Sequence, residues 1–198
     1  MKVSTSKTQL ILASTSETRK QILESYNIKA KYISHNVDEE KEIAKNKGLK
    51  SELAAFLAKK KVESIQNHYN DCLIIGSDQI ILCKNILINK PSTEGDAVKN
   101  LFLLQNNFHT LISAICILTP EGNYVFFEDR ATVYMKKILK SDIKEYVKQN
   151  KNIVYKTSGS YKIEDDKLKC IRKVKGDKET ILGFPIKKAL HLLKAYSR

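Results

Sequence analysis

Hydroxyl and basic side chains follow the first apolar run of the sequence, in the segment LASTSETRK. Ser14 and Ser16 come directly after the run, and Arg19 lies in the first turn of an expected helix. A helix N-terminus presents free backbone N–H groups and the positive end of the helix dipole, which favour an anion. Ser14, Ser16 and Arg19 can add donors for phosphate oxygens. The segment is compatible with a phosphate site, although an ordinary capped helix is the commoner explanation.

A carboxylate interrupts the most apolar stretch of the chain, CLIIGSDQIIL. Asp78 is costly to bury unless it is paired, hydrogen-bonded or bound to a metal, which makes it a candidate base or metal ligand. The alternative is a turn aspartate between two strands, because Gly-Ser-Asp-Gln is plausible turn chemistry. Lys90, before Pro91, reads alone as a surface lysine.

A third polar segment is TSGSYKIEDD. Gly159 lets the backbone approach a ligand, and Tyr161, Lys162 and Glu164 offer stacking, charge and an acceptor. A surface loop is the alternative. The four histidines are far apart and the four cysteines have no paired short spacing, so a metal site built from His and Cys has little support.

These groups need a scaffold, and the hydrophobic pattern predicts an α/β fold. Strands are expected at 10–13, 31–34, 109–119 and 123–138, and helices at 17–26, 49–66, 141–149 and 185–196. A further helix follows Ser92 and Thr93, and residues 72–91 are expected to form two or three short strands broken at 76–79 and at 84–85. The hairpins make the expected sheet mixed and twisted, with flanking helices.

The composition indicates a protein with an ample core. With 198 residues, 42% of them hydrophobic, the chain suits a single domain over 1–198 or two lobes that share a core. The formal charge of +13 would attract phosphate-bearing partners, yet the lysines are scattered in the sequence. The apolar stretch near the N-terminus is too short for a signal peptide, and no run could span a bilayer, so we expect a soluble cytoplasmic protein with reduced cysteines and no membrane partner.

In order and spacing, seven segments resemble the Maf family of nucleotide pyrophosphatases: LASTSETRK, VDEE, LAKKK, GSDQ, NKP, SGSYKIE and KGDKETILGFP. Glu17 replaces the proline of the family pattern and Lys20 its second arginine. The resemblance implies an ITPase-like fold with two lobes around a nucleotide-binding cleft. It also implies hydrolysis of a nucleoside triphosphate between the α and β phosphates, with a divalent cation, Mg²⁺ or Mn²⁺.

Site roles follow from the resemblance by position. Asp78 would be the proton acceptor, and the triphosphate would be bound by Ser14, Arg19, Lys61 and Lys90. Asp78, Glu39 and Glu40 are the candidate metal ligands, and Thr18, Gln79 and Glu164 would select the base. GSDQ and SYKIE resemble the branch that acts on 7-methyl-GTP, in which Glu164 would accept hydrogen bonds from a guanine edge.

Two other functions stay open. One is a pyrophosphatase for dTTP, UTP or another noncanonical triphosphate. The other is a weakly active nucleic-acid-binding or division-related interaction protein, which we rank lower because the sequence has no arginine-rich stripe. We therefore do not expect a nucleic acid partner. The resemblance also suggests a homodimer, although no apolar stripe demands one.

Overall fold

The computed structural model describes residues 8–196, and residues 1–7, which include part of the segment tested for a signal peptide, lie outside it. The chain forms two compact units. The first unit comprises residues 1–79, 113–129 and 177–198, and the second comprises 80–112 and 130–176. No helix within 8–196 is long and apolar enough to cross a membrane.

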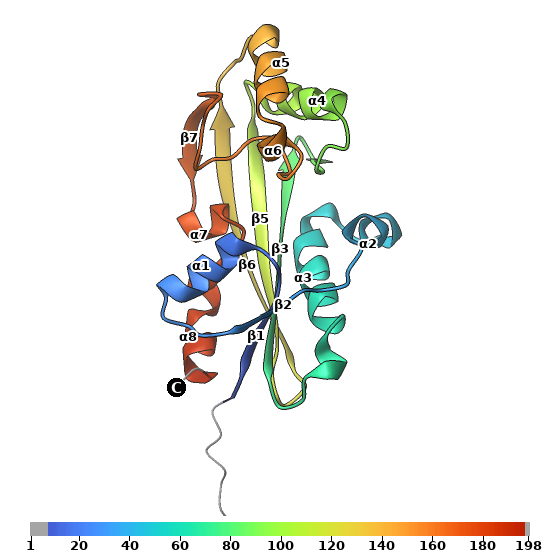
Figure 1. Cartoon of the computed structure of the whole chain (residues 1–198), viewed down its shortest axis with the longest axis vertical. Helices are drawn as coiled ribbons and strands as arrows, with labels where there is room; N and C mark the ends of the chain where they lie inside the picture. The colour runs from blue at the N-terminus through green and yellow to red at the C-terminus, as the bar shows by residue number, and fades with distance from the viewer. Residues whose placement is uncertain (1–7, 197–198) are drawn as a thin grey trace, which may run out of the picture. The chain divides into compact units, whose positions relative to one another are not determined.

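Two strands, β1 and β2, and seven helical segments of the described residues lie wholly in the first unit (Figure 1). Its elements are β1 (Leu10–Ala13), α1 (Glu17–Ser25), β2 (Lys31–Ile33), α2 (Glu39–Lys45), η1 (Lys50–Glu52), α3 (Leu53–Glu63), η2 (Gln66–His68), α7 (Lys178–Ile181) and α8 (Ile186–Tyr196).

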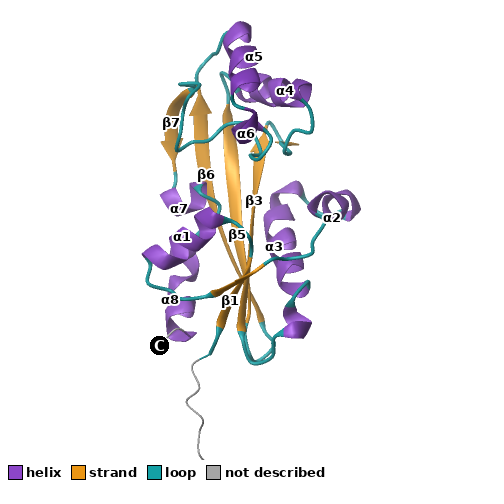
Figure 2. Ribbon diagram, in the orientation of Figure 1, coloured by secondary structure: helices purple, strands orange, loops and turns teal. Residues whose placement is uncertain are grey.

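The second unit holds β4 (Ile86–Leu87), α4 (Glu94–Leu104), α5 (Lys140–Gln149), α6 (Lys151–Val154) and β7 (Ile171–Lys175). Three long strands contribute residues to both units: β3 (Leu73–Cys83), β5 (Phe108–Leu118) and β6 (Tyr124–Met135). Helices and strands are distinguished by colour in Figure 2.

Among the described residues the strands form one sheet in the order β2-β1-β3-β5-β6-β7, with β4 paired to β3. β1 is parallel to both β2 and β3, whereas β6 and β7 are antiparallel. The predicted mixed α/β sheet with flanking helices is therefore confirmed. The single domain over 1–198 and the nucleotide-binding cleft remain predictions.

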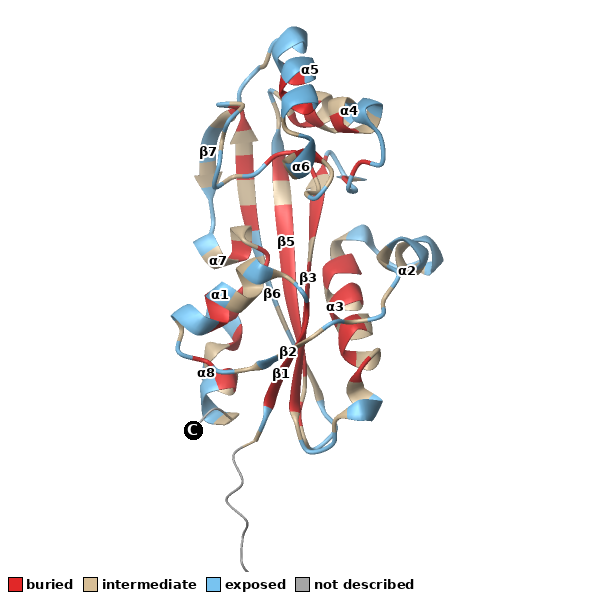
Figure 3. Ribbon diagram, in the orientation of Figure 1, coloured by how far each residue is buried: buried red, intermediate tan, exposed pale blue. Residues whose placement is uncertain are grey.

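Alternating side chains of β1 and β3 build the core of the first unit on both faces of the sheet. Leu12 and Ile75 join a cluster with residues of α1 and α8, including Leu23 and Leu193. Ile11 and Ile74 instead pack with Ala58 and Val62 of α3. The strands of this core are buried (Figure 3), as expected for a sheet with helices on both faces.

β3 differs from the prediction, because it runs unbroken from Leu73 to Cys83. Gly76, Ser77, Asp78 and Gln79, expected as a break between strands, lie inside it. The turn interpretation of Asp78 is therefore wrong. The predicted turn at 84–85 is confirmed, since Lys84 and Asn85 have φ values of 50° and 61° between β3 and β4.

Gly76 allows α3 to lie very close to β3. A Cβ atom at this position would stand 2.1 Å from the Ala58 carbonyl oxygen and 2.8 Å from Cγ2 of Val62. Real Cβ atoms do not approach backbone that closely, so any larger residue would push the helix away. Lys61 lies between these two contact residues on α3, and the glycine therefore brings it to the strand.

Two helix starts follow the predicted capping chemistry. Ser16 is the N-cap of α1, and its side chain accepts a hydrogen bond from the Arg19 N–H. Thr93 caps α4 and forms a reciprocal capping box with Asp96. The expected helix at 49–66 is shorter, because residues 50–52 form a 3₁₀ turn and α3 begins at Leu53.

Candidate active site

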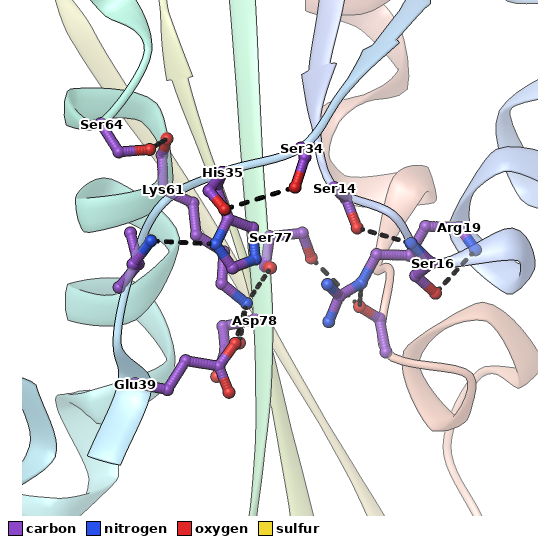
Figure 4. A network of polar contacts seen from close by, with 12 residues as sticks. Ser14, Ser16, Arg19, Ser34, His35, Glu39, Lys61, Ser64, Ser77 and Asp78 are labelled. Carbon is purple, nitrogen blue, oxygen red and sulfur yellow. Dashed lines mark hydrogen bonds and ion pairs between the residues drawn. The ribbon is translucent and has the colours of Figure 1, made fainter. Parts of the chain in front are cut away.

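A buried lysine bridges two carboxylates in the first unit. Lys61 is only 2% exposed, and its Nζ lies 2.5 Å from Oδ1 of Asp78 and 2.7 Å from Oε1 of Glu39. Asp78 is itself 5% exposed, whereas Glu39 is partly open to solvent. Figure 4 shows the three side chains converging beside β3. Pairing with the ammonium group is what makes the buried Asp78 carboxylate tolerable.

Local structure explains how these three side chains meet. Strand alternation points Gly76 and Asp78 to the same face of β3, which is the face that α3 covers. Lys61 is in the last turn of α3, and Glu39 is the first residue of α2, whose N-cap Asp38 accepts from the Lys41 N–H. β1 ends at Ala13, whereas its partner β3 continues past it, so Asp78 lies beyond the carboxyl end of β1. In open α/β sheets ligands bind outside such strand ends.

The N-terminus of α1 presents the predicted phosphate donors in the same unit. Ser14 is buried, and its Oγ accepts a hydrogen bond from the Ser16 N–H at 3.1 Å. Arg19 is half-buried, and its Nε donates to the carbonyl oxygen of Gly183 at 3.1 Å. Only the Nε of the fork is used in this bond. The terminal nitrogens of Arg19 therefore remain the part of the fork that can contact an anion.

The segment around α7 is fixed to the strands by polar contacts. The two N–H groups of Gln79 Nε2 lie within hydrogen-bond distance of three acceptors, which are Ser113 Oγ, the Thr180 carbonyl and the Ile181 carbonyl, at 2.9, 2.9 and 3.0 Å. Thr180 Oγ1 donates to Asp129 at 2.7 Å. These bonds hold the turn that ends in Gly183, a residue with φ +85° that favours glycine. The late KGDKETILGFP motif thus positions Arg19 through a backbone carbonyl.

Burial and neighbouring charges shift the pKa values of Asp78 and Arg19 in opposite directions. Burial raises the pKa of Asp78 above its ordinary value, while the positive charges of Lys61 and Arg19 pull it down. Burial also lowers the pKa of Arg19, and the carboxylates of Asp78 and Glu39 oppose that change. A guanidinium stays charged despite such a shift. The site therefore combines a carboxylate of raised basicity with fixed positive charge.

The divalent cation that the family resemblance implies fits this site if substrate phosphates supply some of its ligands. Within residues 8–196 no group of three or more His, Cys, Asp and Glu side chains is arranged to hold a metal ion. Asp78 and Glu39 do share one cation already, the Lys61 ammonium. Mg²⁺ is commonly held by one or two carboxylates together with substrate phosphates, and this pair meets that need. Glu40 is exposed, and the two carboxylates that Lys61 contacts are those of Glu39 and Asp78.

The remaining predicted site residues lie outside this cluster. Thr18 is half-buried in the first turn of α1. Lys90 and Glu164 are exposed residues of the second unit, and their roles stay predictions. Tyr161 is not available for the stacking considered from the sequence, because it is 5% exposed and its hydroxyl lies 2.6 Å from Nε2 of His109.

Two residues that contribute to this geometry were not singled out from the sequence. Ser77 is fully buried, and its Oγ lies within hydrogen-bond distance of the Ala114 and Gly183 carbonyl oxygens, at 2.8 and 3.1 Å. Gly183 supplies the carbonyl that binds Arg19. Ser77 could have been noticed in the sequence, because a serine is unusual inside an apolar strand. The role of Gly183 could not, because every residue type has a backbone carbonyl.

Comparison with known proteins identifies the family. A profile described as "Maf-like protein" matches residues 9–196, which is nearly the whole chain. The chain belongs to the Maf family. A solved structure of the Staphylococcus aureus Ham1 protein aligns over 95% of this chain and 97% of its own chain, with 13% sequence identity and a TM-score of 0.46.

Relatives of similar length carry two kinds of name. A "dTTP/UTP pyrophosphatase" of Geobacillus sp. is 27% identical over 94% of this chain and 97% of its own length. Another "dTTP/UTP pyrophosphatase", from Alkaliphilus metalliredigens, is 33% identical over 90% of this chain and 91% of its own length. A "Nucleoside triphosphate pyrophosphatase" of Pelagibacter ubique is 30% identical over 94% of this chain and 97% of its own length. None of these three names mentions 7-methyl-GTP, so the expected branch gains no support from them.

Proposed function

We propose that the cluster around Asp78 is the active site of a nucleoside triphosphate pyrophosphatase, which hydrolyses the bond between the α and β phosphates. The chain is a hydrolase of the Maf family, and relatives that span its length are named for this activity. The observation that carries the assignment to this site is the buried Asp78–Lys61–Glu39 bridge, in the same unit as the N-terminus of α1.

Each residue has a distinct task in this proposal. Asp78, as a carboxylate, accepts a proton from the water that attacks the α phosphate. Lys61 and Arg19 stabilise the negative charge that moves onto the pyrophosphate leaving group. Ser14 and the first N–H groups of α1 orient phosphate oxygens. Lys90 is proposed as a further phosphate contact from its place in the NKP motif.

The carboxylates of Asp78 and Glu39 are the residues that would hold a divalent cation, with substrate phosphates as further ligands. Mg²⁺ or Mn²⁺ bound there would neutralise phosphate charge and polarise the reacting phosphoryl group. Because Lys61 already contacts both carboxylates, the ammonium group must move aside or share them when the cation binds. Activity should therefore depend on added Mg²⁺ or Mn²⁺.

For the base, dTTP and UTP are the first substrates to consider, on the names of the relatives. 7-Methyl-GTP is the second candidate, because Gln79 and Glu164 stand at positions that resemble that branch. The Gln79 amide nitrogen is committed to three acceptors, so only its oxygen can face a base. An amide oxygen accepts from a pyrimidine or a guanine N–H alike, and it does not separate the two candidates.

The deciding experiment is pyrophosphate release from a panel of dTTP, UTP, 7-methyl-GTP and the common triphosphates, with and without Mg²⁺ or Mn²⁺. We expect release of a nucleoside monophosphate and pyrophosphate in equal amounts. Asp78→Asn should lower kcat by about 10²–10⁴ without unfolding the chain, since the amide keeps the shape and loses the basicity. Near-normal turnover by the folded variant would assign Asp78 a structural role instead.

A further inference from the structure

The positive charge of the chain is concentrated in the second unit. Residues 80–112 and 130–176 hold 17 Lys and Arg against 7 Asp and Glu, so they carry +10 of the chain's formal charge of +13. The candidate active site lies in the first unit. The excess charge of the second unit is therefore not explained by the residues that surround Asp78.

Part of this charge gathers on one face of the sheet in the second unit. In the antiparallel pairing of β6 and β7, Lys173 stands opposite Tyr134 and Lys175 opposite Thr132, so these four side chains point to the same face. Val133 and Val174 form the alternate pair, and Val133 is fully buried. The Lys173 and Lys175 face is thus the one turned away from the core.

Aromatic rings lie among these cations. The Tyr134 ring is 5.8 Å from the ring of Phe108 on β5. The Arg172 guanidinium and the Lys175 ammonium lie 5.9 and 5.8 Å from the Tyr134 ring centre. Phe108 is 60% exposed, which is unusual for a phenylalanine at the start of a long strand. We call Phe108, Tyr134, Arg172, Lys173 and Lys175 the cationic-aromatic face.

Acidic groups of the same unit are used elsewhere. Asp166 accepts the N–H groups of Cys170 and Ile171, and Asp165 pairs with Lys167. Asp96 belongs to the cap of α4. Among the residues that the structure describes, no carboxylate forms an ion pair with Arg172, Lys173 or Lys175. The face therefore keeps its positive charge for an external anion.

We propose that the cationic-aromatic face binds single-stranded nucleic acid. A row of cations follows a phosphate backbone, and an exposed ring such as Phe108 offers a surface on which an unpaired base can stack. A sheet face with aromatic residues is a recurrent platform for such strands. An acidic protein would satisfy the cations and leave the exposed ring unexplained. The sequence shows only three cations within the five residues of β7, and folding adds the aromatic rings of Phe108 from β5 and Tyr134 from β6.

The test is fluorescence anisotropy with labelled oligothymidylate and oligouridylate of about 20 nucleotides, titrated with the full chain at about 50 and 200 mM salt. The variant Arg172→Ala/Lys173→Ala/Lys175→Ala should bind more weakly and lower the slope of log affinity against log salt by about 2, since each contact to a single strand contributes about 0.7. Phe108→Ala should weaken binding about 5- to 150-fold with an unchanged slope, because stacking releases no counterions.

The matched control removes three exposed lysines of α5 in the same unit, as Lys140→Ala/Lys144→Ala/Lys148→Ala. It should keep most of the affinity, and Arg19→Ala should bind the oligonucleotide like the wild type. Pyrophosphate release should be unchanged in the β7 and α5 triple variants, which separates this proposal from the proposed enzyme activity. Equal loss in the two triple variants, no binding at low salt, or equally tight binding of polyglutamate would overturn it.

Discussion

Asp78 and Lys61 form the pair on which the chemistry rests. The carboxylate must be charged to accept a proton, and burial opposes that charge while the ammonium supports it. The raised pKa of Asp78 places the acid limb of the pH profile above the range of an exposed aspartate, near 3.9. Asp78 is therefore a stronger base than an exposed aspartate, but the enzyme loses activity at a higher pH on the acid side.

Lys61→Met should move the acid limb of kcat/KM to higher pH. Loss of the ammonium removes the attraction that lowers the pKa of Asp78, so the carboxylate becomes protonated at a higher pH than in the wild type. The measurement is kcat/KM between about pH 4 and 9, which reports groups of the free enzyme. Lys60→Met, which removes an ion pair with Glu63 on the same helix, is the control and should leave the limb in place. A limb that stays fixed in Lys61→Met would mean that Asp78 is not the titrating group.

Arg19→Ala should weaken triphosphate binding far more than binding of the parent nucleoside. The guanidinium contacts phosphate oxygens and ignores the base, and charge-assisted hydrogen bonds contribute about 1.5–3 kcal/mol each. Calorimetric titration of the Asp78→Asn background with a triphosphate and with the nucleoside measures both affinities without turnover. The same loss for both ligands would contradict a phosphate role.

At the scale of elements, the contact between α3 and β3 sets the site. The sequence predicted a helix at 49–66 and short strands within 72–91, because the spacing of apolar residues reflects which side chains are buried. It did not predict the unbroken course of β3, because Gly-Ser-Asp-Gln has the residue types of a turn. What decided the outcome was the tertiary contact of Gly76 with Ala58, which residue type alone does not reveal.

Gly76→Ala should destabilise the protein by about 1–3 kcal/mol, because the new methyl group meets the Ala58 carbonyl and forces α3 away. The shift also moves Lys61 from Asp78, so activity should fall more than the folded fraction does. Gly95→Ala on α4 is the matched control, since its Cβ would meet only Thr93 Oγ1 at 3.7 Å. In a helix this change should stabilise by about 0.5–1 kcal/mol. Urea unfolding measures both, and equal stabilities would refute the close approach.

Residue type also left the tertiary contacts of the site residues unpredicted. Asp78, Arg19 and Ser14 were predicted as site residues from residue type and position, and the structure places them in one unit. The hydrogen bond from Arg19 to Gly183 could not be predicted, since the acceptor is a backbone carbonyl 164 residues away. Lys90 and Glu164 lie in the second unit, and their roles await the substrate panel.

The whole molecule carries +13 and acts on an anionic substrate. Its field should attract triphosphates at long range, and salt should screen that attraction. We expect kcat/KM to fall several-fold between about 50 and 300 mM salt while kcat stays nearly constant, because encounter is screened and chemistry is not. Steady-state assays at fixed free Mg²⁺ test this. A fall in kcat with constant KM would instead indicate a salt effect on the catalytic step.

The hydrogen bond between Arg19 and the Gly183 carbonyl also has a consequence for when the active site can form during synthesis of the chain. Gly183 is translated 164 residues after Arg19, so the ribosome must make this whole intervening segment before the arginine can bind the carbonyl. The turn around α7 further supplies the Thr180 and Ile181 carbonyls that bind Gln79. A nascent chain that has already folded α1 and β3 would still lack this arrangement. We therefore expect nucleotide hydrolysis to begin only after the segment that contains Gly183 has been made, and chains that stop before Gly183 should not hydrolyse triphosphates.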